Sequence, residues 1–391
     1  MKLVVIGLGQ CGGRIADEFA RLNRKARVQR GTEIIPGTFA VNTDVADLSG
    51  LSYIRSNYQQ RILIGNQKSG GHGVGKINEL GAEIAREDSD KIIEAVRTTQ
   101  RLAEADAFLL VSSAAGGTGS GAIPVLTQQL KERYADKPLY NLIVLPFEHE
   151  ELTERRTIYN VATCLKSAYL VADAIFLVDN QRYVKKNFSI KTNLAEINTS
   201  VVKPFYNLLS AGEEKKPAYI GSKMLDAGDI IQTLSGWSVI GHGEARFSRF
   251  GFFFRKKHDF REKSLETHKG VQAMQGAISG LSLKCDPADA KRGLYLLSAP
   301  PEEMNMDLIK ELGSRLRDIA TDATIRSGDY PREKGLVNVT IILSELANVK
   351  RITDYFTKAI SYIHTTRRGR EGLEYEHEGL EDLFGDIPSL L

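Results

Sequence analysis

The feature that most constrains the fold of this 391-residue chain is a run of small residues at 115–121, Ala-Gly-Gly-Thr-Gly-Ser-Gly. It follows an apolar stretch at 108–111 that predicts a buried strand, and it precedes a helical pattern over 122–130. Consecutive amides of such a loop can face one oxyanion, and the hydroxyls of Thr118 and Ser120 add donors. The order strand, glycine loop, helix predicts a phosphate-binding loop rather than a surface turn.

The first half of the chain alternates short apolar runs with longer amphipathic stretches. We expect helices over 90–103 and 153–172, between strands near residues 3–6, 38–41, 107–111, 141–145 and 174–178. This order is typical of βαβ units. It predicts an α/β fold with a Rossmann-like parallel sheet.

The chain is too long for one hydrophobic core, so a second unit is expected. The pattern after residue 226 predicts that this unit is smaller and of the α+β class. We expect a helix over 307–320 and strands near 237–241, 250–254, 294–298 and 337–343. A helical pattern over 190–211 ends at Gly212 and predicts a long connecting helix. The predicted parts are a nucleotide-binding domain over 1–188, a central helix over 189–212, a C-terminal domain over 213–362 and a flexible tail over 363–391.

Composition excludes several classes of protein. The formal net charge of +3 is too small to predict nucleic-acid binding. The three cysteines lie far apart without a CxxC spacing, so neither a disulfide framework nor a zinc site is expected. No segment approaches the roughly 20 apolar residues that cross a bilayer. We therefore expect a cytoplasmic protein without direct membrane insertion.

Two further glycine loops limit the type of nucleotide. Gly7-x-Gly9-x-x-Gly12 matches a dinucleotide-binding fingerprint and leaves an NAD-dependent oxidoreductase as an alternative. The loop at 70–77 nearly matches a P-loop, but Ile77 stands where a Mg²⁺-binding hydroxyl is needed. Three glycine loops after successive strands favour a triphosphate over a dinucleotide.

The run at 115–121 resembles the signature of the tubulin/FtsZ superfamily, and the other loops match the family in order. Residues 9–12 resemble the first loop of tubulin, 42–44 the second loop of FtsZ, and 71–75 the third. The mixture is most similar to CetZ, the archaeal tubulin-like group. The resemblance implies a Rossmann-like GTPase domain joined by a long central helix to a smaller α+β domain.

The resemblance also implies that GTP or GDP binds with Mg²⁺, without a dedicated metal site on the protein. Asn180 and Asn198 would read the guanine base, and Glu150 or its neighbour Glu151 would contact the ribose; we favour Glu150. Gly13 stands where relatives mostly have Asn. The implied nucleotide contacts are Gln10, Cys11, Gly12, Gly13, Arg14, Asp44, Gly71, His72, Gly73, Ala115, Gly116, Gly117, Thr118, Gly119, Ser120, Glu150, Asn180 and Asn198.

No P-loop lysine or arginine finger is apparent in the first half, so a catalytic group is expected from another subunit. Residues 226–229 resemble the synergy loop of FtsZ and tubulin, which implies that Asp226 and Asp229 are catalytic and orient water at a neighbour's nucleotide. Met224 replaces the Asn that relatives have two residues before the first acid. The alternative interpretation makes Asp226 the N-cap of a helix over 230–234.

The resemblance implies a cytoskeletal GTPase that polymerises head to tail, hydrolyses GTP at the subunit interface and acts in cell-shape control. A nucleotide-stabilised scaffold with little catalysis is the second alternative. The expected partners are other copies of the chain and a possible adaptor protein, because residues 386–391 resemble the start of the C-terminal docking peptide of FtsZ. No nucleic-acid partner is expected.

Overall fold

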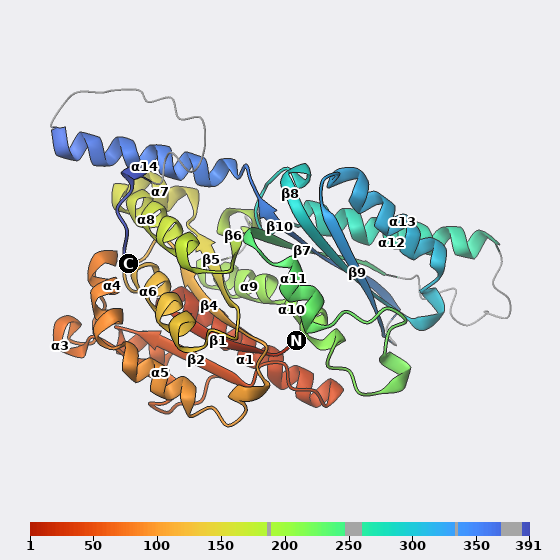
Figure 1. Cartoon of the computed structure of the whole chain (residues 1–391), viewed down its shortest axis with the longest axis horizontal. Helices are drawn as coiled ribbons and strands as arrows, with labels where there is room; N and C mark the ends of the chain where they lie inside the picture. The colour runs from red at the N-terminus through yellow and green to blue at the C-terminus, as the bar shows by residue number, and fades with distance from the viewer. Residues whose placement is uncertain (186–188, 247–259, 333–334, 369–384) are drawn as a thin grey trace. The chain divides into compact units, whose positions relative to one another are not determined.

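The computed structural model describes residues 1–185, 189–246, 260–332, 335–368 and 385–391 (Figure 1). The chain divides into two compact units. The larger unit holds Lys2–Arg24, Ile35–Val202 and Asn348–Leu391. The smaller unit holds Met1, Lys25–Ile34 and Lys203–Ala347. The predicted limits of the four parts of the chain remain predictions.

A fully parallel run of strands forms the centre of the larger unit, in the order β3-β2-β1-β4-β5-β6. Apart from short β3, the strands are buried almost throughout, as expected for a parallel sheet covered on both faces. The strands predicted in the first half are confirmed. They are β1 (Leu3–Leu8), β2 (Gly37–Asn42), β4 (Ala107–Ser113), β5 (Leu139–Leu145) and β6 (Ala174–Asp179). The short strand β3 (Arg61–Leu63) pairs with β2 in addition.

Helices connect and cover these strands (Figure 1). Helix α4 packs on α6, α6 on α8, and α8 on α14. Gly121 permits the first contact, because a Cβ there would lie 2.1 Å from the Asn78 carbonyl oxygen. The helix predicted over 90–103 ends earlier, at Arg97. The helices are α1 (Gly9–Arg30, whose last turns belong to the smaller unit), α2 (Val45–Ser49), α3 (Asn66–Ser69), α4 (Asn78–Glu87), α5 (Ser89–Arg97), α6 (Thr118–Arg133), α7 (Glu148–Thr153), α8 (Arg155–Val171), α9 (Ile190–Val202) and α14 (Lys350–Arg368).

The smaller unit has the predicted α+β character. Its strands lie in the order β7-β10-β8-β9; β10 is antiparallel to β7 and β8, and β8 is parallel to β9. The strands predicted near 237–241, 294–298 and 337–343 are confirmed, whereas the one near 250–254 lies outside the described residues. The elements are β7 (Gly236–Arg246), β8 (Ala290–Ala299), β9 (Thr324–Pro331), β10 (Leu336–Leu346), α10 (Phe205–Ala211), α11 (Ala227–Thr233), α12 (Phe260–Ser279) and α13 (Met306–Ile319).

Two segments differ from their prediction. The helical segment over 190–211 is divided, since α9 ends at Val202 and α10 begins at Phe205. Pro204 explains the break, because proline lacks an N–H and its ring clashes with the carbonyl four residues earlier. In the predicted flexible tail, α14 continues to Arg368, and residues 385–391 pack on the larger unit.

The helices in the described part of the chain do not have the character of membrane spans. None of them combines the length and hydropathy that crossing a membrane requires.

Candidate nucleotide-binding site

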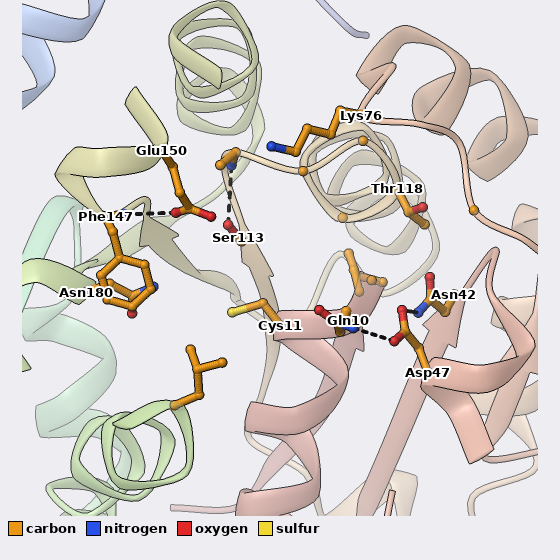
Figure 2. A pocket seen from close by; sticks show the side chains of 18 of the residues that line it. Gln10, Cys11, Asn42, Asp47, Lys76, Ser113, Thr118, Phe147, Glu150 and Asn180 are labelled. Atoms are coloured by element: carbon orange, nitrogen blue, oxygen red, sulfur yellow. Dashed lines mark hydrogen bonds between the residues drawn. The ribbon is translucent and has the colours of Figure 1, made fainter. Parts of the chain in front are cut away.

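A cavity of about 610 Å³ lies in the larger unit, where its parallel strands end. Leu8 ends β1, Asn42 ends β2 and Ser113 ends β4, and all three line the cavity. Phe147 and Asn180, which follow β5 and β6, complete the wall (Figure 2). Open parallel sheets bind their ligands at this edge, and the volume suits a small-molecule ligand.

The structure brings most of the predicted contact residues to this cavity. Those in its lining are Gln10, Cys11, Asp44, Gly73, Ala115, Gly116, Gly117, Thr118, Gly119, Glu150 and Asn180. Those outside the lining are Gly12, Gly13, Arg14, Gly71, His72, Ser120, Asn198 and both acids of the 226–229 loop. On α9 the lining residues are Asn193 and Leu194 instead of Asn198.

The predicted phosphate loop is the start of α6. Gly117 is the N-cap of this helix and has no side chain to accept from the first amides. These amides therefore carry the partial positive charge of a helix N-terminus without an internal acceptor. Gly9, with φ +69°, brings the start of α1 close, because its Cβ would lie 3.0 Å from the Gly119 nitrogen. Two helix starts thus converge on one side of the cavity.

A buried asparagine, which was not predicted from the sequence, donates hydrogen bonds to the backbone carbonyls of the loop. Asn160 of α8 donates from Nδ2 to the carbonyl oxygens of Gly116 (2.9 Å), Lys76 (2.9 Å) and Ala115 (3.2 Å). The Ser120 hydroxyl donates to the Gly116 oxygen as well. These donors occupy the carbonyls. Of the loop amides, that of Ala115 donates to Ser113 Oγ at 3.3 Å and that of Gly121 to the Gly117 oxygen at 3.1 Å, so the first amides of α6 are the ones that can face a ligand. A sequence signal existed in the polar stripe of α8, which is buried: Thr157, Asn160, Thr163 and Ser167.

Two carboxylates lie at the β2 side of the cavity. Asp44 caps α2, and its Oδ1 accepts from the amides of Ala46 (2.8 Å) and Asp47 (3.1 Å). The side chain of Asp47, which was not predicted, accepts from Gln10 Nε2 (2.6 Å) and Asn42 Nδ2 (3.1 Å) (Figure 2). Across the described residues, no three His, Cys, Asp or Glu side chains form a metal cluster.

The geometry separates Glu150 from Glu151. Glu150 lines the cavity, and its Oε2 accepts from the Phe147 amide at 2.9 Å within the capping box of α7. Glu151 is buried and accepts from Arg351 and from the Tyr355 hydroxyl, both on α14. Burial, together with Glu151, raises the pKa of Tyr355. Only Glu150 of the two therefore faces the cavity.

Cys11 lies in the lining between the loop and Asn180 (Figure 2). Burial, followed by the nearby Glu150 carboxylate, raises the pKa of its thiol to about 12. The side chain is therefore a neutral thiol near pH 7. It is suited to packing against a ligand rather than to nucleophilic attack or metal binding.

The cavity also contains a lysine, although none was expected there. Lys76 lines it and has φ +62°, one of two positive values among non-glycine residues in the described ranges. Its Nζ pairs with Glu154 Oε2 at 2.6 Å, and both side chains are exposed. Lys76 was not predicted as a site residue, because Ile77 follows it where a P-loop has Ser or Thr.

The loop at 226–229 belongs to the smaller unit, and its two acidic residues cap the helix that follows. Asp226 caps α11 by accepting from the Asp229 amide at 2.9 Å, while Asp229 Oδ2 accepts from the Asp226 amide at 3.5 Å. The N-cap interpretation of Asp226 is thus confirmed, with α11 beginning at Ala227. Asp229 also lies 3.6 Å from Arg326 Nε.

Comparison with known proteins supplies the family. Residues 2–187 match the GTPase domain of the Tubulin/FtsZ family, and residues 187–361 match the C-terminal domain of tubulin-like CetZ. Tubulin-like protein CetZ1 of Haloferax volcanii is 35% identical over 378 residues, which cover 92% of each chain. Its structure as a GDP-bound monomer matches with a TM-score of 0.79 at 33% identity, covering 93% of this chain and 100% of that one. CetZ2 of the same organism, solved as a GTPγS-bound protofilament, matches with a TM-score of 0.80 at 27% identity, covering 94% and 100%. The chain therefore belongs to the Tubulin/FtsZ family and, within it, to the tubulin-like CetZ proteins.

Proposed function

We propose that this chain binds GTP in the cavity of its larger unit and hydrolyses it on head-to-tail assembly with other copies. The assembled filament would serve the cytoplasmic cytoskeleton in the control of cell shape. One observation carries the proposal: the first amides of α6 have no internal acceptor and line a cavity of nucleotide size. Membership of the family leaves the NAD-dependent alternative without support.

The lining suggests an orientation for the nucleotide. The starts of α1 and α6 would hold the phosphates by backbone amides, as helix N-termini do elsewhere. Asn180, buried at the opposite wall, would read guanine because an amide offers both a donor and an acceptor to the base edge. Glu150 would accept a hydrogen bond from a hydroxyl of the ribose, which lies between the phosphates and the base. Asn198 lies outside the lining, so we give the base contact to Asn180 first.

The acidic side of the cavity suits a nucleotide that brings its own Mg²⁺. Mg²⁺ keeps several waters and is commonly held by phosphates with one or two carboxylates. Asp44 and Asp47 would supply the protein side of such a site, and both already accept hydrogen bonds that fix their orientation. When bound, Mg²⁺ would offset the charge of the phosphates. Lys76 would add a positive charge to the lining of the cavity.

Hydrolysis needs a group that aligns water with the terminal phosphate. We assign this role to Asp226 and Asp229 of a neighbouring copy, because neither belongs to the lining of the cavity in its own chain. A carboxylate can orient the water and accept its proton as the new P–O bond forms and the bond to GDP breaks. The GTPγS-bound protofilament of CetZ2 is consistent with a site formed between copies.

The test is GTP turnover per chain as a function of protein concentration, together with sedimentation in GTP, in GDP and without nucleotide. We expect turnover per chain to rise with concentration and the sedimented fraction to be largest in GTP. Turnover that does not depend on concentration would contradict activation by assembly. GTP-dependent sedimentation without turnover would instead support the scaffold alternative.

A further inference from the structure

The last residues of the chain pack against the larger unit, beside α4 and α8 (Figure 1). The side chains of Ile387 and Leu390 are only 1% and 5% exposed. Leu391, in contrast, is 39% exposed. A segment predicted to be a flexible tail thus places two apolar side chains, three positions apart, in the surface of the folded body.

Polar side chains of the body hold the backbone of this segment. Ser167 Oγ on α8 accepts from the Leu390 amide at 2.9 Å, and Arg86 Nη2 on α4 donates to the Leu390 oxygen at 3.0 Å. Lys166 Nζ on α8 donates to the Ile387 oxygen. Pro388 lies between the two anchors and has no N–H that would need a partner.

The segment is thus held in two ways: its backbone accepts and donates hydrogen bonds, and two of its apolar side chains are buried. Hydrogen bonds to the main chain fix the direction of a bound segment, and pockets for selected side chains give specificity, as in other peptide-binding sites. Ser167 is fully buried, so its hydroxyl is directed into the contact rather than to solvent. Burial lowers the pKa of Lys166, and the charge of the Asp386 carboxylate opposes this effect.

We propose that the larger unit carries a peptide-binding site, formed by Arg86, Lys166 and Ser167, whose occupant is this chain's own segment 386–391. The site is separate from the nucleotide cavity, since none of these three residues lines it. Binding here buries Ile387 and Leu390, so the segment is not available at the same time to the adaptor that its sequence suggested. Release from the site is the step that makes it available.

The test uses full-length chains and a fluorescent peptide with the sequence of residues 385–391. Leu390→Asp should release the segment and leave the site open, and Leu391→Asp is the matched control at the neighbouring exposed leucine. We expect the peptide to bind the Leu390→Asp chain at least about tenfold more tightly than the wild-type or Leu391→Asp chains, because a tethered occupant competes in both. A peptide that itself carries Leu390→Asp should not bind.

Adding Ser167→Ala to the Leu390→Asp chain should weaken peptide binding by roughly three- to tenfold, as expected for one lost hydrogen bond. Equal binding of the peptide to all chains, or binding to none, would overturn the proposal, provided that circular dichroism shows them folded. A wild-type chain that becomes dimeric at higher concentration without nucleotide, while Leu390→Asp stays monomeric, would also overturn it, because the occupant would then belong to a second copy.

Discussion

The predicted phosphate loop at 115–121 contains the start of α6, and the acidic loop at 226–229 contains the start of α11, but the first amides of the two helices are capped differently. The N-cap of α6 is Gly117, which provides no acceptor. The N-cap of α11 is Asp226, which forms a capping box with Asp229. The first loop therefore leaves helix-start amides that a ligand can accept from, whereas the capping box of the second loop forms within the chain. We infer that the chain contains one ligand-dependent and one ligand-independent half of an active site.

The largest effect is expected at the ligand-independent half. Asp226→Asn should keep the N-cap, because Asn caps helices as well as Asp does, but it removes the carboxylate. GTP turnover should fall at least about 100-fold, the usual contribution of a group that accepts a proton from water. Steady-state turnover at a fixed concentration in the assembled state measures this.

The control is Asp226→Ala, which loses both the carboxylate and the cap. It should lower turnover equally and also lower the free energy of unfolding by about 1 kcal/mol. Simultaneous loss of GTP binding in Asp226→Asn would show that this residue belongs to the nucleotide cavity of its own chain.

Adjacent glycines of the phosphate loop provide the next comparison. A Cβ on Gly117 would lie 2.6 Å from Val74 Cγ2 and 2.9 Å from the Ile77 nitrogen, whereas one on Gly116 meets no atom within 4 Å. Gly117→Ala should therefore lower the free energy of unfolding by about 1–3 kcal/mol, as overpacking does. Gly116→Ala should leave it within about 0.5 kcal/mol.

Nucleotide binding separates the two substitutions further. Both alanines should weaken GTP affinity, because Gly116 and Gly117 line the cavity where we place the phosphates. Calorimetric titration of GTP into Gly116→Ala is the sharper measurement, since its fold should be intact. Wild-type affinity in that variant would move the phosphates away from the loop.

Asn180 tests the base end of the cavity. Asn180→Ala should weaken GTP binding by roughly tenfold, the equivalent of one or two lost hydrogen bonds, and should reduce the preference for GTP over ATP. Competition of both nucleotides against a fluorescent GDP analogue measures this preference. Asn198→Ala serves as the matched control and should have the smaller effect, because Asn198 lies outside the cavity lining.

The smallest effect is expected at Lys76. Its ion pair with Glu154 is exposed, so Lys76→Met should change the free energy of unfolding by less than about 1 kcal/mol. GTP affinity should fall a few-fold more than GDP affinity if the amine approaches the terminal phosphate, and this difference should shrink as salt increases. An equal loss for both nucleotides would place the amine elsewhere.

Local patterns were sufficient to predict most of the strands and the order strand, glycine loop, helix at 107–133. Interactions between distant residues were not predictable in this way. Asn160 reaches Lys76 and Gly116 across long stretches of sequence, and Asp47 meets Gln10 only because β1 and β2 are neighbours. Strand β9 was missed because its sequence, Thr-Ile-Arg-Ser-Gly-Asp-Tyr-Pro, contains no apolar run.

Pro204 is a local cause of the break between α9 and α10. The break was not predicted, because the helical pattern continues on both sides of this proline. The packed end of the chain had no such local sign. Its order depends on Arg86, Lys166 and Ser167, which are more than 200 residues away in the sequence.

Completion of the active site by a second copy can be measured by adding an inactive chain to an active one. Wild-type chain is held at a concentration where its turnover is low, and increasing amounts of Asp226→Asn are added. We expect turnover per wild-type chain to rise, because each added cavity can be completed by a wild-type Asp226. Turnover that stays constant as the inactive chain is added would contradict this expectation.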